Sequence, residues 1–339
     1  MTSDAEFDKP DAGTGDRRQR IEDLIDRIKE SADKLAADGS SRGDLKLLSR
    51  ALRELRYGFK VFSPYRHRRK VTIFGSARTA PDAPAYAQAV ALGKAMADAD
   101  WLVVTGAANG IMEAGHRGAG REHSMGLNIM LPFEQEANPV IAGDPKLVNM
   151  KYFFTRKVMF VKECDAVVCL PGGFGTLDEA LEVLTLLQTG KRDIVPLVLL
   201  DAPGSDYWSF FHEFVVNRLL RDGLISRQDL SLYLLTDQLS DAVSEVLNFY
   251  RVYQGMRYVR RKLSLRLARP LSEPTLTRLN QEFRDILQQG DFLQRAALPE
   301  ESDDATHANQ PRLVFHFDRR SHGRLRELIN VINLDDAGE

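Results

Sequence analysis

The hydrophobic pattern near the start of the chain is helical. One apolar series recurs at intervals of three and four residues and predicts a helix that ends at the polar, glycine-containing segment 37–43. A second series after this break predicts another helix. The two series are Ile21, Leu24, Ile25, Ile28, Ala32 and Leu35, then Leu45, Leu48, Leu52, Leu55 and Phe59. Residues 17–62 are therefore expected to form a helical segment, packed on the main domain or on a partner chain.

From about residue 70, short apolar runs alternate with helical segments. The runs are continuous, which is typical of strands that are covered on both faces. This β-α-β-α order predicts an α/β fold, a Rossmann-like, doubly wound parallel sheet over residues 63–254 with helices on both faces. The predicted strands are residues 71–75, 101–105, 126–131, 165–170 and 194–200, and helices such as 85–99 and 176–188 lie between them.

A small α+β module is expected over residues 255–339. Apolar residues at helical spacing predict a helix around 276–287, and alternation predicts a half-buried strand at 312–318. A further strand is expected at 292–298, and a short helix around 325–332.

Composition and charge exclude several classes of protein. The chain has 46 Lys and Arg against 48 Asp and Glu, a formal net charge of -2, which argues against a globally basic nucleic-acid binder. No run approaches 18 apolar residues, so no membrane span is predicted. Residues 1–16 are acidic and polar without the apolar segment of a signal peptide, and they are predicted to be a disordered tail. A cytoplasmic protein is expected.

Neither cysteines nor histidines form a recognisable metal or redox pattern. Cys164 and Cys169 fit no common zinc spacing, and two cysteines exclude a disulfide scaffold. The seven histidines include no metal-binding motif. No metal or cofactor is therefore expected.

Three glycine-rich turns follow predicted strands, at 74–78, 105–114 and 170–179. Parallel sheets bind ligands beyond the carboxyl ends of their strands, where glycine amides and helix N-termini favour phosphate. The third turn lacks the lysine of a Walker A loop, and Asp178 stands where a dinucleotide fingerprint needs glycine. The turns predict a phosphate-containing ligand without favouring an ATPase or an NAD enzyme.

The third turn carries the most specific motif of the chain. Its residues Pro171, Gly172, Gly173, Gly175, Thr176 and Glu179 resemble the PGG-x-GT-x-x-E motif of the LOG (Lonely Guy) family of cytokinin-activating phosphoribohydrolases. The pair Arg156-Lys157 resembles a second family element, within FFTRKVMF rather than the His-Glu-Arg-Lys form of short members. FGSAR (74–78) and LPFEQEAN (131–138) are similar to segments of longer bacterial members, and the resemblance covers roughly residues 70–250.

The resemblance implies hydrolysis of the N-glycosidic bond of a nucleoside 5′-monophosphate to a free base and ribose 5-phosphate. It implies Glu179 as the carboxylate beside an oxocarbenium-like centre and Arg156 as its partner. A purine substrate, AMP or an N6-prenylated adenine nucleotide, and a homodimer or larger homo-oligomer are expected. The candidate phosphate- or nucleotide-binding residues are Gly172, Gly173, Gly175, Thr176, Gly75, Ser76, Gly106, Asn109, Glu113 and Lys157.

Several of these residues also have structural interpretations. Thr176 and Glu179 have the spacing of a helix capping box, and Asn109 is equally suited to capping a helix. His116 and His123 are expected to be solvated. The basic run 256–269 is expected to be the solvated face of a helix, with nucleic-acid binding as the alternative.

Two other functions remain open at this point. A non-catalytic nucleotide or cofactor carrier would not need both Arg156 and Glu179. A nucleic-acid-binding protein would use the basic runs at 66–70 and 256–269. The family was formerly labelled "possible lysine decarboxylase", but no lysine stands in a recognisable pyridoxal-phosphate context.

Overall fold

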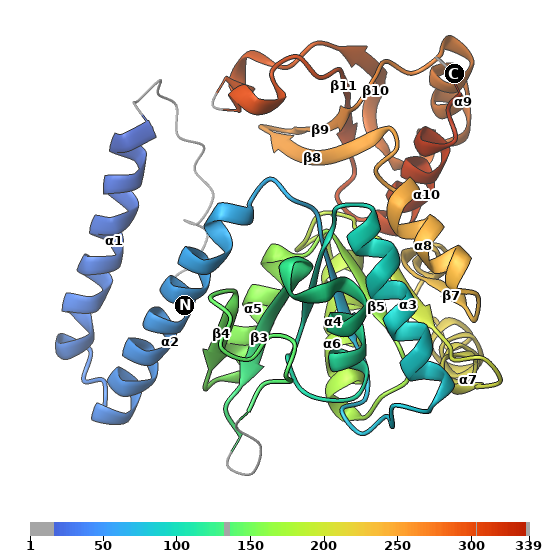
Figure 1. The fold of residues 1–339 in the computed structure, drawn as a ribbon. Coiled ribbons are helices and arrows are strands. Elements are labelled where there is room, and N and C mark those ends of the chain that lie inside the picture. Colours follow the sequence, from blue (N-terminus) through green and yellow to red (C-terminus); the bar gives the residue numbers. More distant parts are fainter. Residues whose placement is uncertain (1–16, 132–135, 303, 337–339) are drawn as a thin grey trace.

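The computed structural model describes residues 17–131, 136–302 and 304–336. This part of the chain contains a seven-stranded sheet of order β4-β3-β2-β1-β5-β6-β7 and a four-stranded sheet of order β10-β11-β9-β8 (Figure 1). Every pair in the first sheet is parallel and every pair in the second is antiparallel. The predicted tail at 1–16 lies outside the described residues.

The larger sheet is the predicted α/β core. Its strands are β1 (Lys70–Phe74), β2 (Leu102–Thr105), β3 (Ser124–Ile129), β4 (Leu147–Met150), β5 (Ala166–Cys169), β6 (Leu197–Leu200) and β7 (Leu234–Thr236). Its helices are α3 (Pro84–Asp98), α4 (Ile111–His123), α5 (Phe153–Glu163), α6 (Phe174–Gln188), α7 (Tyr207–Phe214) and α8 (Leu239–Asn248). The sequence missed β4 and β7 because these strands are short and only partly buried, so they show no continuous apolar run.

Strand order reverses at β1, which pairs with β2 on one side and with β5 on the other. The three glycine-rich turns follow these three strands. A reversal of strand order leaves a crevice at the carboxyl ends of the central strands, where open α/β sheets bind ligands. The topology therefore brings turns that are far apart in sequence to one edge of the sheet.

Two long helices precede the core, α1 (Arg17–Ala37) and α2 (Arg42–Phe62). Ser41 and Asp44 form a capping box at the start of α2, with each backbone N–H donating to the other residue's side chain. One face of α2 is buried through Ala51, Gly58 and Phe62. In contrast, α1 stands away from the rest of the molecule (Figure 1), and from residue 21 onward only Leu35 is as much as half-buried.

The C-terminal module contains the antiparallel sheet and two helices. Its elements are β8 (Tyr253–Val259), β9 (Lys262–Leu267), α9 (Glu273–Glu282), β10 (Leu287–Arg295), β11 (Arg312–Phe317) and α10 (His322–Asn333). Short 3-10 segments occupy Ser63–Tyr65, Arg227–Leu232, Arg284–Ile286, Pro299–Glu301 and Ala305–His307, and a π-helical turn spans Val215–Leu220.

The helix expected within 256–269 is wrong, because this stretch forms the β8–β9 hairpin. Leu263, Leu265 and Leu267 are fully buried at a period of two, while Arg260 takes a φ of 54° in the connecting turn. Its basic side chains also meet acidic residues of the same module. Arg260 pairs with Glu300, Arg266 with Asp304, and Arg269 with Asp335. These ion pairs reduce the positive charge with which this stretch could bind nucleic acid.

Among the described helices, none combines the length and the apolar character needed to cross a bilayer.

Candidate active site

A cavity of about 800 Å³ opens at the reversal of strand order. The turns after β1, β2 and β5 all contribute to it, and helix α5 closes one side with Arg156. Of the candidate residues from the sequence, the structure places these around the cavity: Gly75, Ser76, Gly106, Arg156, Gly172, Gly173, Gly175, Thr176 and Glu179. The fold thus gathers segments from residues 75 to 179 around one space.

Helix α6 begins three residues earlier than a capping box at Thr176 and Glu179 requires. Its N-cap is Gly173, without a side-chain cap, and the Thr176 amide donates to the Gly173 carbonyl at 3.0 Å. The capping-box interpretation is therefore wrong, because Thr176 lies in the first turn and Glu179 in the second. Glu179 is 3% exposed. A buried carboxylate that caps nothing and lines a cavity needs another explanation than local helix stability.

The glycines of the third turn have different reasons to be glycine. A Cβ at Gly172 would lie 2.2 Å from Thr176 Oγ1 and 3.0 Å from the Ser76 amide nitrogen, so packing excludes a larger residue there. A Cβ at Gly173 or Gly175 would meet no atom within 4 Å. Packing within the chain therefore does not require glycine at these two positions, and the space beside them is open.

The start of α6 presents backbone donors to the cavity. The amides of Thr176 and Leu177 already donate to the Gly173 carbonyl. Those of Phe174 and Gly175 precede them, and the first amides of a helix have no intrahelical acceptor. The Tyr207 hydroxyl donates to the Gly172 carbonyl at 2.7 Å and holds the turn in place. Backbone amides at a helix N-terminus, together with the helix dipole, favour an anion.

Arg156 is a half-buried cation with an unused donor. Its guanidinium carbon lies 5.1 Å from the ring centre of Phe153 and 5.6 Å from that of Phe160. Its Nε is buried and has no hydrogen-bond partner among the described residues. Burial lowers the pKa of Arg156 while the carboxylates of Glu179 and Asp178 oppose that change, and guanidinium stays protonated in proteins. A buried N–H without an acceptor is costly, so the Nε of Arg156 is a donor that an acceptor atom in the cavity would satisfy.

Glu179 lies between Lys157 and the cavity. Burial raises the pKa of Glu179, and the charges of Lys157 and Arg156 work against this rise. The Lys157 ammonium lies 3.3 Å from Glu179 Oε2, 2.9 Å from Asp178 Oδ2 and 2.8 Å from Glu182 Oε2. One cation thus bridges the neighbouring carboxylates of Asp178 and Glu179, an arrangement unlike an acid/base pair.

Three candidate residues lie outside the cavity lining. Asn109 is exposed and does not cap α4, whose N-cap is Gly110 without a side-chain hydrogen bond. The Glu113 carboxylate pairs with Arg117 at 2.8 Å. Lys157 forms ion pairs with the three carboxylates of Asp178, Glu179 and Glu182 and does not line the cavity. The sequence could not separate these residues from true lining residues, because all three lie close to motif positions.

The expectation of a solvated His116 is wrong. This side chain is completely buried, with Nε2 at 3.1 Å from Thr105 Oγ1 and 3.0 Å from the Met125 carbonyl, and Nδ1 at 3.2 Å from Asn138 Nδ2. Burial lowers the pKa of His116 to about 4, so the ring is neutral at pH 7. His116 therefore holds Thr105, at the end of β2, in place, and the Thr105 hydroxyl in turn accepts a hydrogen bond from the Ala107 amide in the following turn. His123 is half-buried, 3.6 Å from Asp100.

The sequence missed several residues that line the cavity. They are Phe74, Ala77, Arg78, Ala108, Met112, Asn128, Ile129, Leu131, Glu136, Phe153, Phe160, Phe174, Leu177 and Tyr207. Arg78 is an exposed cation at the end of the FGSAR motif, so its place in that motif was a usable signal. No comparable signal marks the aromatic residues, because they come from β1, α5, α6 and α7 and only the tertiary fold brings them together. No lysine occurs among the described lining residues.

Residues 105–246 match the family described as "Possible lysine decarboxylase". Plant proteins named as cytokinin riboside 5′-monophosphate phosphoribohydrolases match parts of the same region. The probable enzyme LOG6 of Arabidopsis thaliana is 37% identical over 107 residues, which are 30% of this chain and 51% of that protein. The probable enzyme LOG4 of rice (Oryza sativa subsp. japonica) is 26% identical over 183 residues, 52% of this chain and 76% of that protein.

The chain carries a LOG-family domain. The relationship to the plant enzymes is distant, and the chain spans about half the length of LOG6, LOG1 and LOG3 of Arabidopsis. The matched region of the LOG-family domain begins at the end of β2 and includes Arg156, the glycine-rich turn and Glu179. β1 and Ser76, which also border the cavity, precede it.

Solved structures with a related fold were also found. The molybdenum cofactor binding protein from Rippkaea orientalis gives a TM-score of 0.38 at 18% identity, over 52% of this chain and 94% of that one. DNA processing protein A from Helicobacter pylori gives 0.36 at 16% identity, over 53% of this chain and 80% of that one.

Proposed function

We propose that this chain hydrolyses the N-glycosidic bond of a purine nucleoside 5′-monophosphate, giving free base and ribose 5-phosphate. The observation that carries the proposal is the buried carboxylate of Glu179 in one cavity with the amides of the glycine-rich turn and the unpartnered Arg156. Adenine or an N6-substituted adenine is the proposed base, by likeness to the plant proteins named as cytokinin riboside 5′-monophosphate phosphoribohydrolases.

The 5′-phosphate would be held where the fold offers donors to an anion. The amides of Phe174 and Gly175 and the hydroxyl of Thr176 lie at the start of α6, and Arg78 adds a cation at the cavity edge. Ser76 comes from the turn after β1 and borders the same space. A phosphate fixed there by several donors positions the sugar relative to the second turn of α6, where Glu179 lies.

Glu179 would act on the sugar. Glycosidic cleavage passes through an oxocarbenium-like transition state, which a nearby carboxylate stabilises while orienting or deprotonating water. Both tasks need ionised Glu179, and Lys157 and Arg156 favour that form against the effect of burial. Arg156 would contact the nucleotide with its unused Nε. The surrounding rings of Phe153 and Phe160 reduce the access of water, which strengthens these interactions.

Incubation of the full chain with a panel of nucleoside monophosphates tests the proposal directly. Chromatography should detect free base and ribose 5-phosphate from AMP or an N6-substituted AMP, and not from the matching nucleoside or triphosphate. Binding of AMP without any release of base would instead favour the alternative of a nucleotide carrier.

Gly175→Ala is expected to separate binding from stability. An added Cβ meets no protein atom, and alanine is the better helix former, so the free energy of unfolding should rise by up to about 1 kcal/mol. The methyl group would occupy the space proposed for phosphate, so KM for the nucleotide should rise about tenfold. Thermal unfolding and steady-state kinetics measure both effects. A normal KM would place the phosphate elsewhere.

We also propose that the chain forms a homo-oligomer through α1 and α2. Apolar side chains of both helices are exposed: Ile21, Leu24, Ile25, Ile28, Leu45, Leu48 and Leu52 are each 39–58% accessible. Helix α1 as a whole has six basic and five acidic residues, but the five acidic ones all fall within residues 21–33, where only two are basic; α2 has six basic and two acidic residues. This charge difference favours packing of α1 against α2 of a second copy.

The dimensions of these helices are sufficient for such an interface. A helix of 21 residues is about 31 Å long. Four such helices, two from each copy, would bury on the order of 1,200 Å² through strips about 10 Å wide, the lower end for stable interfaces.

The double variant Leu24→Glu with Ile28→Glu is expected to dissociate this oligomer, because it places two carboxylates in the apolar contact. Light scattering coupled to size-exclusion chromatography gives the mass of each species. Asp26→Glu with Glu30→Asp changes the opposite face of α1 without altering its charge and should preserve the assembly. A monomeric wild-type chain, or an assembly that survives the apolar-face variant, would contradict the proposal.

A further inference from the structure

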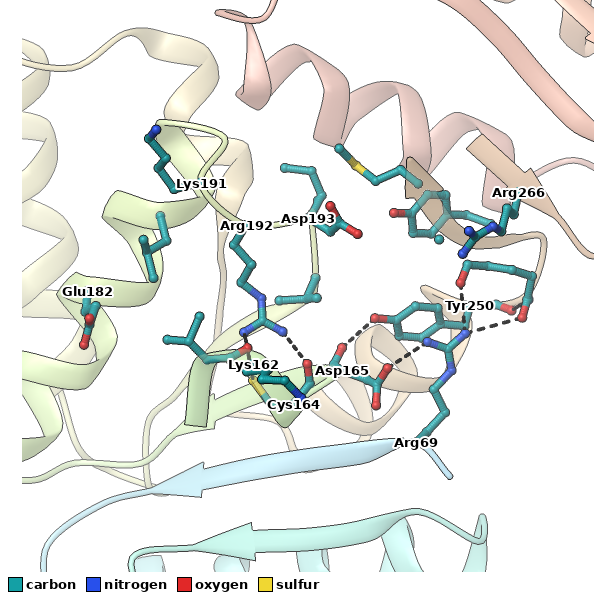
Figure 2. A pocket seen from close by; sticks show the side chains of 18 of the residues that line it. Arg69, Lys162, Cys164, Asp165, Glu182, Lys191, Arg192, Asp193, Tyr250 and Arg266 are labelled. Atoms are coloured by element: carbon teal, nitrogen blue, oxygen red, sulfur yellow. Dashed lines mark hydrogen bonds and ion pairs between the residues drawn. The ribbon is translucent and has the colours of Figure 1, made fainter. Parts of the chain in front are cut away.

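A second cavity, of about 630 Å³, lies between the LOG-family core and the C-terminal module. The core contributes Arg69 and the segments around Cys164 and Arg192, and the module contributes the start of β8 and Arg266 from β9. Figure 2 shows Arg192 and Asp193 on one side of this cavity and Tyr250 and Arg266 on the other. It shares no lining residue with the nucleotide cavity.

Three polar groups that belong to this lining have no hydrogen-bond partner among the described residues. They are the hydroxyl of Tyr253, Nε of Arg192 and Nε of Arg266, all of them buried atoms. The Tyr253 side chain is 1% exposed. A buried donor without an acceptor costs free energy, so three of them beside one cavity indicate a ligand with acceptor atoms.

All three groups are donors at neutral pH. Burial holds the pKa of the Tyr253 hydroxyl well above its usual range, and arginine does not lose its proton in proteins. Arg192 is fixed in place, because its guanidinium also donates to the carbonyls of Val161 and Cys164 at the end of α5. Arg266 is fixed by its ion pair with Asp304 at 2.7 Å. Such donors need no rearrangement to bind.

The charge of the lining favours an anion. Five lining residues are cationic, namely Arg69, Lys162, Lys191, Arg192 and Arg266, against the acidic Asp165, Glu182 and Asp193. Arg69 pairs with Asp165 at 2.9 Å, Arg266 with Asp304 at 2.7 Å and Lys162 with Glu163, while Glu182 pairs with Lys157 at 2.8 Å from outside the lining. These pairs leave Lys191 and Arg192 against Asp193. Asp193 has no ion pair within 4 Å among the described residues, and it offers an acceptor for a hydroxyl or amino group of the same ligand.

We propose that this cavity binds a small organic anion whose phosphate or carboxylate oxygens accept hydrogen bonds from Tyr253 Oη, Arg192 Nε and Arg266 Nε. The ligand would contact the core and the module at once, so its binding would stabilise their association. The proposal does not depend on the reaction at Glu179, and binding rather than turnover is the readout.

Tyr253→Phe is the sharpest variant, because it removes only the hydroxyl. Since the hydroxyl has no hydrogen-bond partner among the described residues, the variant without added anion should unfold at the same temperature as the wild type or at a higher one. Titration with inorganic phosphate or with citrate, at constant ionic strength set by chloride, should raise the unfolding temperature of the wild-type chain. Tyr253→Phe should weaken the binding constant about tenfold.

Phosphate can also enter the cavity at the start of α6, so each titration is repeated in a Gly175→Ala background, whose added methyl group occupies the space proposed for phosphate. The effect of Tyr253→Phe should persist there. Tyr258→Phe on the same strand does not touch the cavity and is the matched control. Arg266→Lys keeps a cation for Asp304 but lacks the Nε donor, and it should weaken binding as Tyr253→Phe does.

The two probes distinguish the kinds of ligand. Tighter binding of phosphate indicates a phosphorylated ligand, and tighter binding of citrate indicates a carboxylate ligand. Three results would overturn the proposal. These are the absence of any shift with either probe, equal effects of Tyr253→Phe and Tyr258→Phe, and a clear loss of stability in anion-free Tyr253→Phe.

Discussion

Replacement of Glu179 by glutamine is expected to lower kcat on a nucleoside monophosphate by about 10²- to 10⁴-fold, the usual contribution of a general base. Glutamine keeps the shape of the side chain but can neither accept a proton nor stabilise an oxocarbenium-like centre by charge. The fold should persist, because Glu179 caps no helix and Lys157 retains Asp178 and Glu182 as partners. Steady-state kinetics and circular dichroism measure both outcomes.

Stability and pH dependence provide an independent check on Glu179. Its folded-state pKa is raised by burial, so the folded chain binds a proton more tightly at this site than the unfolded chain does. As pH rises from the pKa of Glu179 in the unfolded chain to its higher pKa in the folded chain, this site therefore lowers the free energy of unfolding. Glu179→Gln should be at least as stable as the wild type at pH 7. In the pH profile of kcat, the apparent pKa of the acidic limb should therefore lie above the ordinary pKa range of glutamate.

Glu182→Gln is the matched control for Glu179. It lies one turn further along α6 and pairs with the same Lys157, but it does not line the nucleotide cavity. Its kcat should stay within a few-fold of the wild type. Equal losses in the two variants would show that the whole charge cluster, and not the Glu179 carboxylate, is required.

Arg156→Met is expected to lower kcat/KM by about 10²- to 10³-fold, the cost of losing a preorganised electrostatic contact. Methionine retains the apolar stem beside Phe153 and Phe160 and removes a half-buried cation whose Nε has no hydrogen-bond partner in the described part of the chain. The unfolding temperature should therefore change little. Kinetics over a range of nucleotide concentrations, together with thermal unfolding, provide the measurements.

A variant in the loop between β4 and α5 tests whether the effect of Arg156→Met comes from the place of Arg156 in the cavity or only from the loss of a positive charge. Lys151→Met removes an exposed cation outside the cavity, so its kcat/KM should remain close to that of the wild type. A large loss there, or normal kinetics in Arg156→Met, would remove Arg156 from the proposed site.

Errors of the sequence analysis arose where local spacing fits two structures. Thr176 and Glu179 have capping-box spacing, yet α6 starts at Phe174 because Gly173 becomes its N-cap. The leucines at 263, 265 and 267 fit a strand as well as a helix, and pairing with β8 and β11 decided for the strand. His116 looks polar in sequence, but Thr105, Met125 and Asn138 satisfy its ring from other elements.

The sequence by itself determined the α/β order of the core and its main strands, because continuous apolar runs reflect burial on both faces of a sheet. It also determined the glycine-rich turn at Gly172–Thr176 and the motif that marks the LOG-family domain. These features depend on local spacing along the chain.

Only the tertiary structure decided which side chains share a cavity. Placing β1 between β2 and β5 brought Ser76, Gly106 and the third turn together, and the same packing partly buried Arg156 while it drew Lys157 to carboxylates. The second cavity also exists only because the β8–β9 hairpin docks on the core. Burial and charge environment depend on contacts between distant segments, which no local pattern in the sequence encodes.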